Sequence, residues 1–100
     1  MVLARVIGTV VATRKDDRLN GSKLQIVQPV SLGDMSPDGK PLVAIDAVGA
    51  GEGEIVMVCA GSSARQTSRT KDTPCDAVIM AIIDSLDVGG RQVYSKSQAR

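Results

Sequence analysis

The chain has 100 residues and a formal net charge of +1, and 43% of its residues are hydrophobic. This length fits one small domain, and the composition is that of a folded globular protein rather than a disordered one. The balanced charge argues against non-specific electrostatic binding of nucleic acid. The absence of histidine removes the commonest general base and the commonest metal ligand.

Alternating apolar residues predict a first strand over residues 2–13, with its even-numbered positions on the core face. Gly8, in the middle of this strand, indicates a bend or a β-bulge. A second strand is expected over residues 23–30, with Pro29 near its end. One face of the second strand carries Leu24, Ile26 and Val30. The turn-forming residues that follow, up to position 41, predict a loop.

A third strand is expected over residues 42–48, and it contains Asp46, which needs a hydrogen-bonding partner if it is buried. The glycine-rich segment 49–54 then predicts a tight connection, where the backbone takes a positive φ or approaches another group closely. A fourth strand is expected over residues 55–60. The serines that follow favour a short helical turn over residues 61–67, capped by one of them.

Residues 76–88 contain an apolar run that fits either a buried helix or a buried strand, and their β-branched side chains favour the strand. Residues 93–94 are expected to add a short edge strand. Five short strands with one helical turn predict an all-β protein, and a small closed or nearly closed barrel is the compact solution. We expect residues 1–88 to form this domain and residues 89–100 to form the edge strand and a polar tail.

The core of this barrel must be small, because Phe and Trp are absent and Tyr94 is the only aromatic residue. Aliphatic side chains bury less area than aromatic ones, so stabilisation by a partner subunit is expected. Cys59 and Cys75 match no zinc or redox spacing. One disulfide is formally possible, and two reduced, buried thiols are the preferred interpretation. The chain shows no convincing signal peptide and no membrane-spanning run, which predicts a cytoplasmic location.

Each group of residues that could form a catalytic or cofactor-binding site lacks a feature that such a site requires. Residues 49–53 read GxGxG rather than GxGxxG, and no helix is expected after them, so the dinucleotide-binding fingerprint lacks its context. The serines of residues 61–67 have no histidine to activate them, and helix capping is the simpler interpretation. The paired carboxylates show no sign of convergence on a cleft. The sequence therefore predicts no catalytic residues, no metal site and no cofactor.

Several segments resemble, in order, the EutN/CcmL family, the vertex proteins of bacterial microcompartment shells. The resemblance covers residues 1–88, and its clearest motifs are ARVIGTVVATRK, LQIVQP, DAVGAGEGE and GSSARQ. It implies a five-stranded barrel of the oligonucleotide/oligosaccharide-binding (OB) type. It also implies a homopentamer that closes the corners of a polyhedral shell in the bacterial cytoplasm, among hexagonal shell proteins. Membership would make the chain structural rather than enzymatic.

The resemblance also gives two loops a structural role at the ring axis or at the subunit interface, where small residues allow close packing. The candidate pore or interface residues are Gly49, Gly51, Gly53, Gly61, Ser62, Ser63 and Arg65. Arg5 is expected to pair with a carboxylate across the interface if it is buried. A nucleic-acid-binding OB-type barrel is the alternative, against which the near-neutral charge and the lack of aromatic residues argue. A small enzyme is the least favoured reading.

Overall fold

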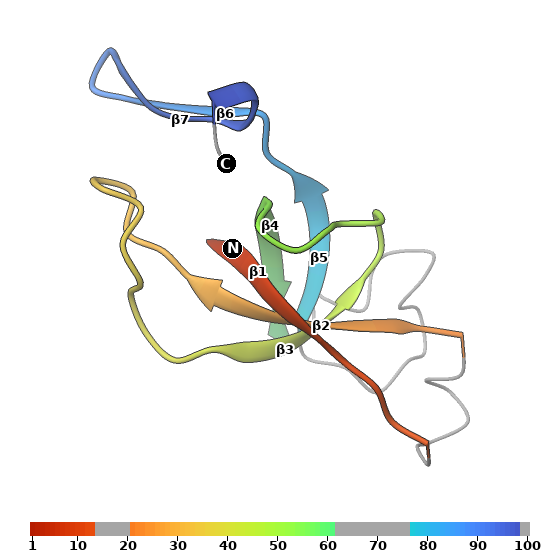
Figure 1. Cartoon of the computed structure of the whole chain (residues 1–100). Helices are drawn as coiled ribbons and strands as arrows, with labels where there is room; N and C mark the ends of the chain where they lie inside the picture. The colour runs from red at the N-terminus through yellow and green to blue at the C-terminus, as the bar shows by residue number, and fades with distance from the viewer. Residues whose placement is uncertain (14–20, 62–76, 99–100) are drawn as a thin grey trace.

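The computed structural model describes residues 1–13, 21–61 and 77–98. Its five main strands are β1 (Val2–Val10), β2 (Lys23–Pro29), β3 (Leu42–Asp46), β4 (Ile55–Ala60) and β5 (Ala77–Ile82). They close into a barrel in the order β1-β2-β3-β5-β4, which is visible in Figure 1. The neighbouring strands are antiparallel, except for the parallel pair β3 and β5. The all-β class, the five-stranded barrel and the preference for strand over helix in residues 76–88 are confirmed. The barrel strand in this segment ends at Ile82 rather than running to residue 88.

Strand β1 pairs with both β2 and β4 and bends at a bulge. Its register with β2 shifts between Val6 and Gly8, as the glycine had indicated. Before the bulge, Ala4 and Val6 are fully buried. After the bulge, the Thr9 hydroxyl donates a hydrogen bond to buried Gln25, 2.9 Å away. The expectation that every even-numbered position faces the core is therefore wrong beyond Gly8, because the bulge shifts the alternation by one residue.

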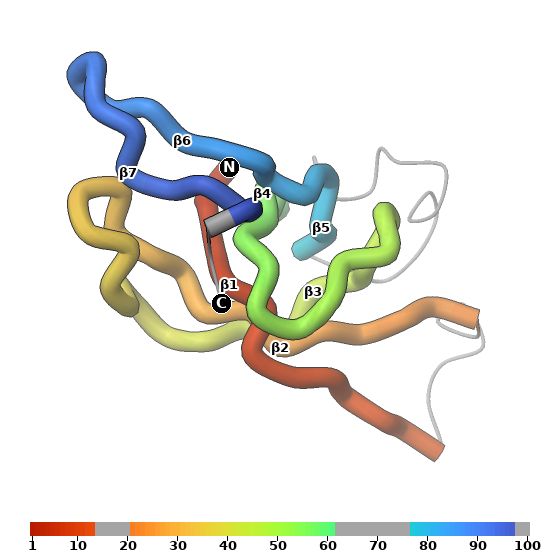
Figure 2. The backbone as a smooth tube through the Cα atoms, turned by 45° about the horizontal axis from the view of Figure 1, so that its top comes forward, coloured from red at the N-terminus to blue at the C-terminus, as the bar shows by residue number. Residues whose placement is uncertain are grey.

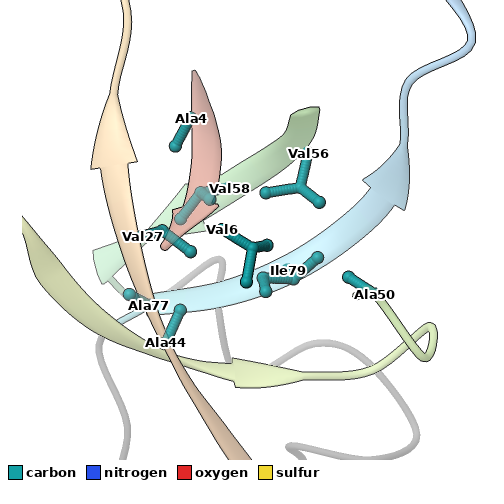
Figure 3. Packing of buried hydrophobic residues seen from close by; sticks show 9 residues of the cluster. All are labelled: Ala4, Val6, Val27, Ala44, Ala50, Val56, Val58, Ala77 and Ile79. Atoms are coloured by element: carbon teal, nitrogen blue, oxygen red, sulfur yellow. The ribbon is translucent and has the colours of Figure 1, made fainter. Parts of the chain in front are cut away.

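The barrel interior is filled by small aliphatic side chains from all five strands and from the loop after β3 (Figure 3). Most are valine or alanine, whose short side chains fit the narrow lumen of a five-stranded barrel. The nine buried residues of this cluster are Ala4, Val6, Val27, Ala44, Ala50, Val56, Val58, Ala77 and Ile79. The absence of Phe and Trp therefore suits the interior rather than leaving it empty.

A second buried cluster lies on the outer face of the barrel. Ile45 pairs with Val78, which pairs in turn with Cys59, and all three are buried. Successive residues of a strand face opposite sides, so these three point away from the interior lined by their neighbours. Leu24 packs against this cluster from β2. The side of β2 that the sequence predicts as its core face thus lies on the outside of the barrel. On the opposite side of β2, the polar residue Gln25 is buried in the interior.

Cys59 offers a direct test of this outer cluster. It is a free cysteine and 6% exposed, whereas Cys75 lies outside the described residues. We expect Cys59→Ser to lower the free energy of unfolding by about 1–3 kcal/mol, because it buries a hydroxyl among apolar neighbours. Cys59→Ala should cost about 1 kcal/mol, since it removes only the sulfur atom. Urea denaturation of both variants checks the order, and a serine variant at least as stable as the alanine variant contradicts it.

The last strands, β6 (Ser85–Val88) and β7 (Arg91–Ser95), form a separate two-stranded sheet followed by the 3-10 helix η3 (Lys96–Gln98). Figures 1 and 2 show this hairpin beyond the end of β5, standing away from the barrel. Gly89 and Gly90 form its turn with positive φ angles. The expected division at residue 88 falls in this turn. The edge strand expected at residues 93–94 is part of β7, and it pairs with β6.

Candidate subunit interface

The glycine-rich loop (residues 47–54) joins β3 to β4 and needs its three glycines for two different reasons. Gly49 and Gly53 have φ angles of 81° and 90°, a region that favours glycine. Gly51 has no positive φ, but a Cβ atom there would lie 3.3 Å from the Glu54 carboxylate. The sequence prediction is therefore confirmed: Gly49 and Gly53 have positive φ angles, and Gly51 lies close to another group.

Asp46, the last residue of β3, holds the first half of this loop. Asp46 is only 6% exposed. Its Oδ1 atom accepts the N–H groups of Val48 and Gly49, both at 2.9 Å, and its Oδ2 atom accepts the Ala50 N–H at 2.8 Å. The expectation that buried Asp46 needs partners is confirmed. The sequence did not reveal that these partners are amides of the adjoining loop.

Gln25 extends this polar network into the barrel. Its Nε2 atom donates to the Ala50 carbonyl at 2.8 Å and lies 3.4 Å from the Asp46 carboxylate. Its Oε1 atom accepts the Thr9 hydroxyl. Lys23 Nζ also approaches the Ala50 carbonyl, at 3.5 Å. Sequence reasoning missed Gln25, because its interior position becomes evident only once the outward orientation of the apolar residues of β2 is known.

Glu54, Arg5 and Lys96 hold the second half of the glycine-rich loop. Glu54 Oε1 accepts the Gly51 N–H at 2.5 Å, and Glu54 Oε2 lies 2.6 Å from Lys96 Nζ of η3. Arg5 Nη1 donates to the Gly53 carbonyl at 3.1 Å. Arg5 is half-buried, and within its own chain it pairs with this carbonyl. The expected carboxylate partner across an interface stays a prediction. Contacts from β1 and from the C-terminal helix thus meet at this end of the loop.

The Glu54–Lys96 ion pair predicts a pH dependence. The Lys96 ammonium, and then the Gly51 N–H, hold the pKa of Glu54 below its ordinary 4.5, and Glu54 raises the pKa of Lys96 above 10.5. The stabilisation is therefore complete between pH 4.5 and pH 10.5, and it fades as the pH falls through the lowered Glu54 pKa or rises through the raised Lys96 pKa.

Lys96→Met should make the melting temperature depend less on pH, both below pH 4.5 and above pH 10.5, and thermal melts measure this. The loss at neutral pH should be small, because Lys96 is 45% exposed and water screens the pair. Arg91→Met, at an exposed hairpin position, is the matched control and should leave the pH profile of the melting temperature unchanged. Identical profiles for the Lys96 variant and the unmodified chain contradict the assignment.

The other candidate interface residues follow β4. Gly61 is exposed, with a φ of 68°, and it lies at the opposite end of β4 from Gly53. Ser62, Ser63 and Arg65, with the expected helical turn, lie outside the described residues. The structure therefore brings Gly49, Gly51 and Gly53 together in one loop and separates Gly61 from them by the length of a strand.

The barrel also exposes apolar side chains, and two groups of them bear on association. A groove of about 410 Å³ is lined by Met1, Val2, Leu3, Val30, Leu32 and Met57. Met1 is 85% exposed, and Leu32 is 51% exposed at the rim of this groove. On another part of the outer face, Val43 is 48% exposed beside Ile26, its partner on β2. Contiguous exposed apolar surface is typical of proteins that associate.

The described part of the chain contains neither a cluster of metal ligands nor a membrane-spanning helix. Among residues 1–13, 21–61 and 77–98, no three His, Cys, Asp or Glu side chains are grouped to hold a metal ion. Over the same ranges, no helix has both the length and the apolar character that crossing a membrane requires.

Comparison with known proteins places the chain in a family. Residues 1–84 match the family described as ethanolamine utilisation protein EutN/carboxysome. The chain is 45% identical, over 87% of its length and 97% of the relative, to the bacterial microcompartment shell vertex protein GrpN of Rhodospirillum rubrum. It is 41% identical, over 96% of each chain, to the shell vertex protein EutN of Salmonella typhimurium.

Solved structures agree with this placement. The structure of CcmL from Gloeobacter violaceus matches with a TM-score of 0.92 and 39% identity, over 98% of this chain and all of that one. A pentameric shell protein structure, GrpN of Rhodospirillum rubrum, matches with a TM-score of 0.80, over 88% of this chain and 99% of that one. The chain therefore belongs to the EutN/CcmL family of bacterial microcompartment shell vertex proteins.

Proposed function

We propose that five copies of this chain form a ring that closes a corner of a polyhedral microcompartment shell. The observation that carries this proposal is the match, over nearly the whole chain, to a structure described as a pentameric shell protein. A flat layer of hexagonal tiles cannot close on itself, and fivefold units inserted at the corners supply the missing curvature. The hexagonal shell proteins are accordingly the proposed partners of the ring.

A ring also requires two different contact surfaces on each copy, because each subunit meets its two neighbours through different faces. The apolar groove beside Met1 and the outer face around Val43 are two such surfaces. We assign both to contacts with neighbouring copies of this chain, since burying them in a ring removes exposed apolar area from water. In this arrangement residues 1–88 form the vertex domain, and residues 89–100 complete the hairpin and form the tail.

Two loops are proposed to lie at the ring axis or at the subunit interface. The glycine-rich loop contributes Gly49, Gly51 and Gly53, and the turn after β4 contributes Gly61, Ser62, Ser63 and Arg65. The support for the first loop is its hydrogen bonding, to the Asp46 carboxylate at the end of β3 and to the Glu54 carboxylate within the loop. A surface held in one conformation loses less entropy when it binds a neighbour.

The proposed role is structural, without turnover of substrate and without a cofactor. The relatives are shell vertex proteins, and they give no support to the nucleic-acid-binding alternative. Deletion of the gene tests this role in the host. We expect shell facets that form but fail to close, which gives elongated or leaky compartments, while the enclosed enzymes keep their specific activity in lysate. Closed shells of normal shape, together with loss of one enzymatic step in lysate, contradict the proposal.

A further inference from the structure

The backbone N–H groups of the glycine-rich loop are turned toward the chain's own carboxylates. Four consecutive amides, from residue 48 to residue 51, donate to carboxylate oxygens: the first three to Asp46 and the fourth to Glu54. Three more loop amides donate to backbone carbonyls, namely Ala47 N–H to Ile79, Gly53 N–H to Val6 and Glu54 N–H to Gly51. The amide donors of this loop are thus almost all consumed inside the subunit.

The groups left on the outside of the loop are hydrogen-bond acceptors. In the described part of the chain, the carbonyl oxygens of Val48, Gly49 and Glu52 accept no hydrogen bond. These three residues are exposed, and the Glu52 side chain adds a carboxylate without an ion-pair partner among the described residues. A surface of this kind pairs with N–H groups and with cations, and it disfavours other acceptors and anions.

We propose that Asp46 is a positioning residue that fixes the glycine-rich loop as an acceptor surface, and that this surface docks onto donor groups of a second copy of the chain. The proposal rests on the proposed function, which puts the loop at the contact between copies. Asp46 serves this purpose better than a neutral side chain, because a carboxylate offers only acceptors and can hold three amides at once.

Asp46→Asn removes this property with almost no change in volume. Whichever oxygen the asparagine Nδ2 atom replaces, a donor would face two N–H groups: those of Val48 and Gly49 at Oδ1, or those of Ala50 and the Gln25 side chain at Oδ2. An amide left without an acceptor costs enough to change an equilibrium by about tenfold or more. We expect the chain concentration at half-assembly to rise by about that factor, while the circular dichroism of the barrel remains that of the unmodified protein.

The assembly of the variants is measured by sedimentation velocity over a dilution series, beside the matched control Asp38→Asn. Asp38 is exposed, and its side chain makes no hydrogen bond within the described residues. Asp38→Asn should assemble as the unmodified chain does. If Asp46→Asn and Asp38→Asn assemble equally well, the positioning role is wrong.

Glu52→Lys keeps the proposal testable if Asp46→Asn fails to fold. This exposed charge reversal puts a cationic donor on the acceptor surface, and it should weaken assembly relative to Asp38→Lys without lowering the stability of the barrel. Equal assembly of Glu52→Lys and Asp38→Lys overturns the acceptor surface.

Amide hydrogen exchange of the unmodified chain gives an independent reading of the anchored amides. The N–H groups of residues 48–50 should exchange slowly although the loop lies at the surface, and exchange at free-loop rates overturns the anchoring by Asp46. If the unmodified chain forms no ring at all, the proposed function fails, whereas a normal ring that tolerates both substitutions refutes only this inference.

Discussion

Ile79→Ala is expected to lower the free energy of unfolding by about 2–5 kcal/mol. Ile79 is fully buried and is the largest member of the interior cluster, whose other members are valine and alanine. These small neighbours cannot expand to fill the space, so most of the cavity remains. A small domain has a total stability of about 5–15 kcal/mol, so the loss is a large fraction of it.

Met80→Ala is the matched control, because Met80 is the next residue of β5 and is 39% exposed. It should cost well under half as much as the interior substitution. Urea denaturation at one fixed chain concentration measures both variants, since assembly makes the apparent stability depend on concentration. Equal destabilisation by the two substitutions would show that β5 does not present Ile79 to a packed interior.

Gly49→Val should disrupt assembly far more than it disrupts the barrel. A Cβ atom at Gly49 would meet nothing within 4 Å among the described residues, so crowding at Cβ is not the cause of the effect. That effect comes from the backbone, because a β-branched residue at a φ of 81° is strained by about 1–3 kcal/mol. Relief of this strain moves the loop away from Asp46, and a displaced loop no longer fits a neighbour.

Gly51→Ala separates backbone strain from crowding. Gly51 has no positive φ, and a Cβ atom there would approach only the end of the flexible Glu54 side chain, at 3.3 Å. This variant should therefore assemble better than Gly49→Val. Size-exclusion chromatography with light scattering gives the mass of each. Rings of native mass for Gly49→Val, at an unchanged melting temperature, contradict a role of this loop in assembly.

The strands and the class of the fold were predictable because local patterns determine them. The predicted bounds of β4 are the observed ones, and Gly8 indicated the bulge in β1 correctly. The inward and outward faces were less predictable. A barrel with a packed patch on its outer face has apolar residues on both sides, so the apolar alternation of β2 did not distinguish Ile26 outside from Val27 inside.

The anchoring of the glycine-rich loop was predictable only in part. Three closely spaced glycines indicated unusual backbone geometry, and Asp46 in an apolar strand indicated a need for partners. Their actual connection is long-range: Gln25 comes from β2, and Lys96 comes from the last helix of the chain. No periodicity in the sequence reports such contacts, because closure of the barrel brings Gln25 to the loop and the C-terminal hairpin brings Lys96 to it.

Native mass spectrometry of the purified, unmodified chain tests the central claim most directly, because it counts the subunits of the assembly. The chain has a mass of 10.4 kDa. We expect a dominant species of five times this mass at micromolar concentration. A compact, folded monomer at micromolar concentration, or a closed assembly with another number of copies, would contradict the fivefold vertex.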